Sequence, residues 1–168
     1  MFTNRVRQAF AATLQGLPLM QTIEDFDPPA IEMDMEKMQG GRFIAEEMAK
    51  GAKELTCKLS LQGMGAPIML ALGASGDNYI LLNVREAGKD QDDNTWFTYH
   101  TIGGTFKSLK EKTLKMGDKP VTDLEISVRT YNRLENGIPV IDIDTRTQKF
   151  ILNGVDILGD ARRAVLLA

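Results

Sequence analysis

One cysteine and one histidine occur among the 168 residues, and their scarcity excludes several kinds of chemistry. Cys57 has no second cysteine to pair with, so the fold needs no internal disulfide and no oxidising compartment, and a reducing cytosol suits it. A Ser-His or Cys-His catalytic pair would have to use His100, which lies in the run WFTYHT with no nucleophile motif around it. We therefore expect a buried packing cysteine, an ordinary strand histidine and no enzymatic activity.

Long apolar runs are also absent. The longest, APIMLALGA, is too short to span a bilayer, and the start MFTNRVRQAF lacks the apolar core of a signal peptide. We expect a soluble chain that is not exported by that route and does not insert into membranes. Neither sign of charge dominates, because 20 Lys and Arg stand against 23 Asp and Glu for a net charge of -3. Such a balance suits neither a general nucleic-acid binder nor a membrane-surface protein, and the length predicts one domain, 1–168.

Complete motifs for metals and cofactors are missing as well. Residues 90–94, DQDDN, have the first, third and fifth ligand spacing of a calcium loop, but Thr95 replaces the glycine of the sixth position and Thr101 the glutamate of the twelfth. We interpret this segment as a polar hairpin tip. The pair Gly103-Gly104 fits no phosphate-loop spacing and indicates a bend or bulge in a strand. The sequence therefore predicts no cofactor and no metal site.

Alternating apolar and polar residues are the strongest feature that the chain does have. Residues 31–38 place Ile and two Met on one strand face and three acids on the other, and residues 53–61 place Leu and Cys opposite Glu, Thr, Lys and Ser. We expect these two strands to pair as an antiparallel hairpin. Their connector, 40–52, is longer than the two to five residues that usually turn a hairpin. A partner surface is expected to cover its apolar side chains, which are Phe43, Ile44 and Met48.

Two more hairpins follow along the chain. The β-branched and aromatic content of 78–86 and 95–109 predicts two strands that flank the polar tip. Alternation in 123–134 and the return segment 138–144 predict another pair around Asn136-Gly137, the strongest short turn signal in the chain. The expected fold class is therefore mainly β, a sandwich or barrel-like subunit with one or two short helices.

Patterns compatible with a short helix occur in three places, the first on spacing alone. Residues 4–15 carry apolar side chains at helical spacing, and residues 65–75 combine an early proline, strong helix formers and a closing glycine. After Gly154 the tail predicts a third helix, capped by Asp156 and with two arginines near its C-terminal end.

The last hairpin and the tail, TYNRLENGIPVIDIDTRTQKFILNGVDILGDARR, resemble the C-terminal signature of the major tail tube proteins of contractile-tailed bacteriophages, a family shared with R-type bacteriocins. The most specific part is NGVD followed by a spaced Leu and Arg, and the chain length and order of elements agree over nearly the whole sequence. The matching positions are Tyr131, Leu134, Gly137, Ile143, Asp144, Asn153, Gly154, Val155, Asp156, Leu158 and Arg162.

This resemblance implies a structural, non-enzymatic protein without cofactors. It implies that six subunits form a ring whose inner strands join into one continuous β-barrel, that the rings stack into the inner tube of a contractile tail, and that DNA passes through on ejection without specific binding. The implied partners are further copies of the chain, the sheath protein, the tape-measure protein, and the baseplate and tail terminator proteins. The implied location is the virion, after assembly in the host bacterial cytoplasm, and the resemblance suggests an extended arm where the N-terminal pattern suggests a helix.

For such a ring we also predict where individual residues lie. The polar strand faces are expected to line the channel, the connector 40–52 to reach the next ring, and the tail 154–168 to brace a subunit boundary. The channel-lining set is Glu32, Asp34, Glu36, Thr56, Lys58 and Ser60; the inter-ring contacts are Phe43, Ile44 and Met48; the subunit contacts are Asp156, Leu158 and Arg162.

Two other functions fit the sequence. One is a ring protein of a bacteriocin or a type VI-like secretion apparatus, which carries effectors in place of DNA. The other is a monomeric β-sandwich that binds carbohydrate on exposed aromatic side chains such as Trp96 and Tyr99.

Overall fold

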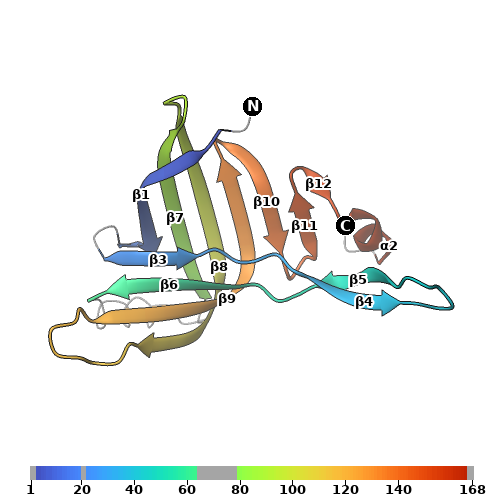
Figure 1. Ribbon diagram of the computed structural model, residues 1–168, viewed down its shortest axis with the longest axis horizontal. Helices are drawn as coiled ribbons and strands as arrows, with labels where there is room; N and C mark the ends of the chain where they lie inside the picture. Colours follow the sequence, from blue (N-terminus) through green and yellow to red (C-terminus); the bar gives the residue numbers. More distant parts are fainter. Residues whose placement is uncertain (1–2, 20–21, 64–78, 166–168) are drawn as a thin grey trace.

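The computed structural model describes residues 3–19, 22–63 and 79–165, and these are mainly in β-strands (Figure 1). The predicted mainly β fold class is confirmed. The strands are β1 (Arg5–Leu14), β2 (Leu17–Pro18), β3 (Ile23–Asp27), β4 (Met33–Met38), β5 (Glu46–Ala52), β6 (Thr56–Gln62), β7 (Tyr79–Asp90), β8 (Thr95–Glu111), β9 (Val121–Glu135), β10 (Ile138–Asp144), β11 (Lys149–Leu152) and β12 (Val155–Asp156), and the described helix is α2 (Gly159–Ala164).

The two longest strands, β8 and β9, belong to both halves of one large antiparallel sheet. In one half the strand order is β2-β1-β7-β8-β9-β10-β11-β12. In the other half β9 leaves β10 and pairs with β6, which in turn pairs with β3. Figure 1 shows β3 and β6 running across β1, β7 and β8, so the two halves cover each other. The predicted hairpins β7–β8 and β9–β10 are both confirmed.

A pair of glycines lets the sheet change direction between its halves. Gly103 pairs with Thr130 and Gly104 pairs with Val128, so one extra residue bulges out of β9 at this point. A Cβ atom on Gly104 would lie 2.1 Å from the backbone oxygen of Ser127, a distance that no side chain tolerates. Such bulges bend a strand and increase its twist. The predicted bend at Gly103-Gly104 is confirmed.

The core lies between the two halves and takes one face of most strands of the large sheet. In β6 every second side chain is buried, and the same period appears in β9 from Thr122 to Val128. Cys57 is fully buried, and burial raises the pKa of its thiol to about 12, so it packs as an apolar side chain in the way the alternation predicts. The largest buried aliphatic side chains are Leu14, Leu19, Leu59, Leu61, Ile80, Leu82, Ile102, Leu124 and Ile126.

The N-terminal helix prediction is wrong. Residues 5–14 form β1, which pairs antiparallel with β7 along nearly its whole length. Side chains four positions apart share a face in a strand as well as in a helix, so the spacing of Val6, Phe10 and Leu14 did not discriminate between the two. The predicted helix at 65–75 lies outside the described residues.

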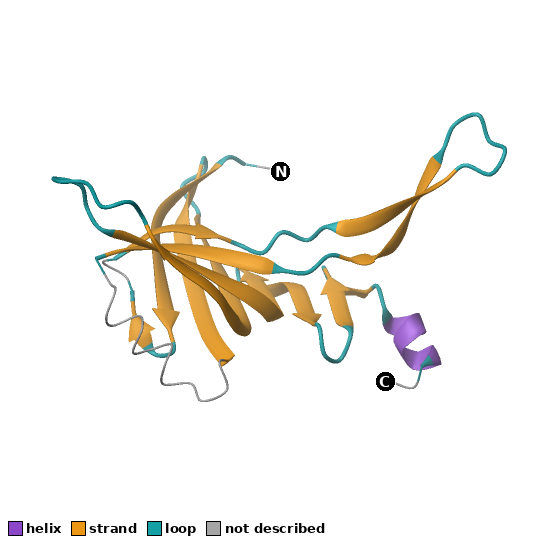
Figure 2. Cartoon of the chain, turned by 90° about the horizontal axis from the view of Figure 1, so that it is seen from below, coloured by secondary structure: helices purple, strands orange, loops and turns teal. Residues whose placement is uncertain are grey.

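The predicted pairing of 31–38 with 53–61 is also wrong. β4 pairs with β5, which lies inside the segment interpreted as a connector, and the two form a separate two-stranded ribbon. β6 instead pairs with β3 on one side and β9 on the other, so no edge of β6 is left for β4. We call residues 31–54 the arm, and Figure 2 shows its two strands extending away from the remainder of the sheet.

The tail helix is shorter than predicted and has a different start. α2 begins at Gly159, after the turn residue Leu158, and no side chain caps it. Asp156 lies in β12 instead, where its carboxylate accepts a hydrogen bond from Arg162. The expected cap is therefore replaced by an ion pair that ties the helix to the strand before it.

Candidate assembly surfaces

A polar face covers the half of the sheet made by β3, β6, β9 and the C-terminal part of β8. Thr56, Lys58 and Ser60 project from β6 on this face, opposite the buried side chains of the same strand. Ser60 donates a hydrogen bond to Asp123 of β9 at 2.7 Å between oxygens, and Ser108 of β8 donates one to a carboxylate of β9 at 3.1 Å. The structure thus brings together the three polar residues of 53–61 that were expected to face a channel.

This polar face carries charges of both signs. Sequence reasoning missed most of them, although the alternation in 121–128 puts its acids on the side away from the core. The carboxylates that line the groove on this face belong to Asp25, Asp27, Asp123 and Glu125, and the ammonium groups to Lys58, Lys110 and Lys112. Lys107 of β8 also pairs with Glu125 on this face, so four carboxylates stand against four lysines and the charges balance.

The same half of the sheet ends in two strand edges. β3 pairs with β6 alone, and within the described residues the segment 106–111 of β8 pairs with β9 alone. Exposed edges carry unpaired backbone N–H and C=O groups, which are sites for pairing with another chain.

The acids predicted to line the channel together with β6 lie elsewhere. Glu32, Asp34 and Glu36 are exposed residues of the arm. Glu36 lies 3.9 Å from the ammonium of Lys50 and Glu32 lies 3.8 Å from that of Lys53, so both take part in surface ion pairs across the ribbon. A register shift after Asp34 puts Glu36 directly opposite Met48, so the arm has no cleanly apolar face.

The tip of the arm exposes large apolar side chains. Phe43 is fully exposed, Ile44 is 78% exposed and Met48 is 61% exposed, while Met35 and Met38 are also accessible. Only the base of the arm, through Ile31 and Met33, packs against the core. Exposed apolar groups on a projecting ribbon gain nothing in an isolated subunit, so they indicate a contact surface.

The C-terminal residues form a small braced unit. Arg162 contacts Asp156 at 2.5 Å between nitrogen and oxygen and donates a second hydrogen bond to the backbone of Gln148. Leu158 packs against the edge of the core. The three residues expected to make subunit contacts therefore lie close together.

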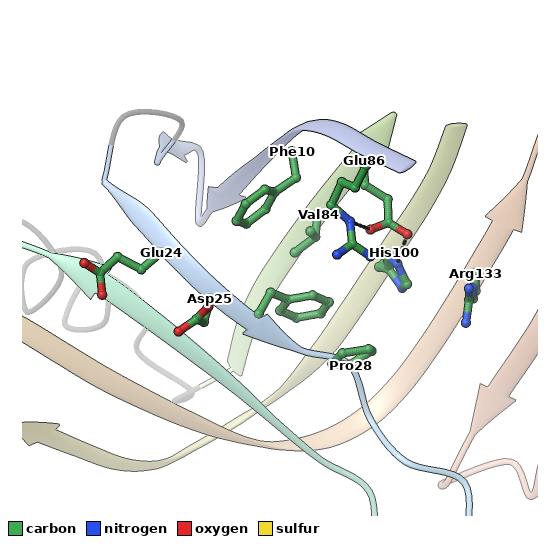
Figure 3. A pocket seen from close by; sticks show the side chains of 10 residues that line it. Phe10, Glu24, Asp25, Pro28, Val84, Glu86, His100 and Arg133 are labelled. Carbon is green, nitrogen blue, oxygen red and sulfur yellow. Dashed lines mark hydrogen bonds and ion pairs between the residues drawn. The ribbon is translucent and has the colours of Figure 1, made fainter. Parts of the chain in front are cut away.

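A buried polar cluster lies where β3 crosses the other half of the sheet (Figure 3). His100 lies 2.9 Å from the hydroxyl of Tyr131 and 3.7 Å from Glu86, which in turn accepts a hydrogen bond from Arg7. Burial, and then the neighbouring Arg133, lowers the pKa of His100. Burial raises the pKa of Tyr131 to about 12. At neutral pH both side chains are uncharged, and they hold two strands together.

The described residues give little support to other kinds of site. Trp96 is buried and lies on the strand face opposite Tyr99, so the two do not form the exposed platform that carbohydrate binding would use. In the same part of the chain, no three or more His, Cys, Asp or Glu side chains gather to hold a metal ion. No helix found there combines the length and the apolar character needed to cross a bilayer.

The polar sheet face, the two strand edges that are unpaired among the described residues, and the projecting arm with its exposed apolar tip together define a β-structured subunit suited to assembly. Residues 5–165 match the model of the family described as phage tail tube protein FII, and the chain belongs to that family. Its function is structural, as a protein of the tail tube, which confirms the function predicted from the C-terminal signature. No curated protein sequence matches the chain significantly.

Solved structures with a similar fold come from contractile injection systems. A chain from the sheath/tube terminator of an extracellular contractile injection system (PVC) has a TM-score of 0.55 at 10% identity, over 75% of this chain and 93% of that one. A chain from the sheath-tube complex of the same system has a TM-score of 0.55 at 8% identity, over 75% and 88%. A chain from the anti-feeding prophage baseplate has a TM-score of 0.51 at 14% identity, over 80% and 97%.

Proposed function

We propose that six copies of this chain close into a ring and that the rings stack into the inner tube of a contractile phage tail. The observation that carries the proposal is the four-stranded polar sheet, whose two outer edges have no partner strand among the described residues. The free edge of β3 in one subunit pairs with the 106–111 edge of β8 in the next, which removes every edge of that sheet once the ring closes.

The size of the resulting channel follows from strand spacing. Four strands from each of six subunits, about 4.8 Å apart, give a backbone diameter of at least about 37 Å, which strand tilt widens. The grooves of B-DNA reach about 8 Å inwards from its surface on each side of the axis, so the duplex is roughly 20 Å across. It therefore passes through the channel with room for side chains and water. The chain acts in this ring as a single tube domain.

The wall of this channel is suited to passage and not to binding. Thr56, Lys58 and Ser60 lie on it, among carboxylates and lysines in equal number. Tight binding of DNA needs a surplus of Lys and Arg to neutralise phosphates, which this face lacks. The arm continues from β3 and β6 beyond the subunit (Figure 1), so its acids Glu32, Asp34 and Glu36 extend the wall across the junction between rings.

The exposed tip of the arm makes the contact between rings. Burial of a large apolar side chain such as Phe43 contributes about 1.5–3 kcal/mol, and a ring repeats the contact six times. The C-terminal group of Asp156, Leu158 and Arg162 braces a boundary with a neighbouring subunit. We infer that the remaining partners are the sheath, the tape-measure protein, the baseplate and the tail terminator.

Several further properties belong to this proposal. The protein is not an enzyme, and it needs no cofactor. It is assembled in the cytoplasm of the host bacterium and resides in the virion. The membership of the tail tube family supports this placement, and the similar fold of the injection-system chains supports the tube architecture.

Electron microscopy of the purified full-length protein tests the proposal. We expect six-fold rings and tubes with a central channel. Deletion of residues 42–49 removes the apolar tip and should leave a folded protein that forms rings without stacking. A wild-type chain that stays monomeric at high concentration would overturn ring formation, and normal tubes from the deletion would overturn the role of the arm.

A further inference from the structure

The tip of the arm requires a binding surface in the adjacent ring, and a suitable surface lies at the opposite end of the molecule. We propose that the tip of the arm docks on the loop between β8 and β9, residues 112–120, of a second copy of this chain in the adjacent ring. This inference rests on the proposed tube function and adds the surface that receives the arm.

The first argument is position. The arm extends from one end of the long axis of the molecule, and the 112–120 loop lies at the other end, in both Figure 1 and Figure 2. A contact between two different patches at opposite ends is heterologous, and heterologous contacts repeat without limit along an axis. Contact between two copies of the arm would instead be isologous, and it would stop after two rings.

The second argument is exposed apolar surface. Within the described residues, the loop 112–120 presents Leu114 at 83% exposure and Met116 fully exposed, beside a shallow groove that Pro120 helps to form. The tip of the arm presents Phe43 and Ile44, which are exposed to a similar degree. Exposed apolar surface of this kind indicates a contact site, and contact between the tip and the loop would remove both surfaces from water.

The third argument is charge. The tip of the arm, residues 42–49, contains two acids and one base, a net charge of -1, and the whole arm has a net charge of -2, whereas the loop contains three lysines and one aspartate, a net charge of +2. In the part of the chain that the structure describes, neither Asp34 nor Glu47 of the arm forms an ion pair with another side chain. The three loop lysines, Lys112, Lys115 and Lys119, form none there either. Opposite charges on the two surfaces select this pairing over contacts between two arms or two loops.

Charge reversal tests the pairing. The arm variant is Glu46→Lys with Glu47→Lys, and the loop variant is Lys115→Glu with Lys119→Glu; Lys112 is left unchanged because it also lines the polar face. A control variant, Lys89→Glu with Arg146→Glu, makes the same charge change as the loop variant, but at the β7–β8 tip and the β10–β11 turn.

We expect each of the arm and loop variants to form rings but to raise the critical concentration for tubes tenfold or more. The variant that combines all four substitutions should form tubes again. An equal mixture of the arm and loop variants should also form tubes, because each arm then meets a loop of opposite charge in alternating rings. The control variant should assemble like the wild type.

The outcomes separate this inference from the proposed function. If the loop variant stacks like the wild type, the acceptor assignment is wrong while the tube proposal stands. If the control variant loses tubes to the same extent, the effect comes from net charge and the assignment is again wrong. If the wild-type chain forms neither rings nor tubes, the proposed function itself fails and the assignment with it.

Cross-linking adds a readout that does not depend on charge. A Phe43→Cys, Met116→Cys double variant carries one reactive thiol at each surface, since the native Cys57 is fully buried. A bis-maleimide should link successive subunits along the tube into a ladder of covalent multimers, and neither single variant should give one. Dimers from Phe43→Cys alone would indicate contact between two arms and would overturn the proposal.

Discussion

Replacement of Gly104 by alanine is the sharpest test of how the sheet is bent. The added Cβ would lie 2.1 Å from the backbone oxygen of Ser127, 2.9 Å from its carbonyl carbon and 3.1 Å from a methyl group of Ile126. Relief of these contacts requires backbone movement in β9, because the nearest atoms belong to main chain. Overpacking of this kind costs about 1–3 kcal/mol, and more where backbone has to shift. We therefore expect a loss of about 3 kcal/mol.

Two other glycines supply matched controls. A Cβ on Gly103 would lie 2.0 Å from the hydroxyl of Tyr79 and 2.6 Å from that of Thr130. Both are ends of side chains, which can rotate away, so Gly103→Ala should cost about 1 kcal/mol, similar to one hydrogen bond. Gly51 of the arm has open space around it and an unstrained backbone, so Gly51→Ala should stay within about 0.5 kcal/mol of the wild type.

Urea unfolding followed by fluorescence of the single tryptophan, Trp96, measures these differences at concentrations where the subunit is dispersed. We expect the loss of stability to be largest for Gly104→Ala, smaller for Gly103→Ala and smallest for Gly51→Ala. Equal losses for the first two would show that β9 adapts as easily as a side chain does. In that case the bulge would not depend on glycine, and the reasoning would be refuted.

Three further predictions concern the core and the tail. The pKa of His100 is lowered by burial and by Arg133, so the unfolded chain binds more protons at His100 than the folded chain does. The free energy of unfolding should therefore fall by at most about 1 kcal/mol from pH 6.5 to 5.5. His100→Gln should remove this pH dependence, which urea titrations at several pH values would measure. Leu59→Ala should cost about 2–5 kcal/mol because Leu59 is fully buried, whereas Lys58→Ala on the opposite strand face should be nearly neutral by thermal unfolding. Asp156→Ala should cost about 0.5–1 kcal/mol locally and speed hydrogen exchange in 159–164, and unchanged exchange would show that the ion pair does not hold α2.

Local signals in the sequence were sufficient for two of the three predicted hairpins and for the core faces of their strands. Asn136-Gly137 marks the β9–β10 turn because both residues adopt positive φ there, +50° and +82°. Alternation identified which side chains of β6 and β9 are buried, because a strand exposes its two faces in turn. The family resemblance came from a short motif in the tail, and the family match extends it to residues 5–165.

Strand partners could not be predicted in the same way. Alternation indicates which face of a strand is buried and says nothing about which strand lies beside it. β5, with the sequence EEMAKGA, has no β-branched or aromatic residue and is exposed along its whole length, so neither propensity nor periodicity marks it as a strand. Its partner β4 was therefore assigned to the next strongly alternating segment, β6. The acids of β3 were missed for a related reason, since a strand of five residues is too short to show a clear period.

The division between a packed body and a bare arm suggests how assembly is kept orderly. The core joins residues of β1, β6, β7, β8, β9, β10 and β11, so the subunit has its main hydrophobic stabilisation before any copy binds. The arm has little, because only its base packs against the core, and a two-stranded ribbon with so few packing contacts is marginally stable in water. The free energy gained from a single arm contact therefore has to offset the entropy lost when the ribbon becomes ordered. The net gain from one contact is small. In the proposed six-fold ring, six such contacts form together and share one loss of translational freedom, so we expect stacking to be favourable for rings and weak for isolated subunits.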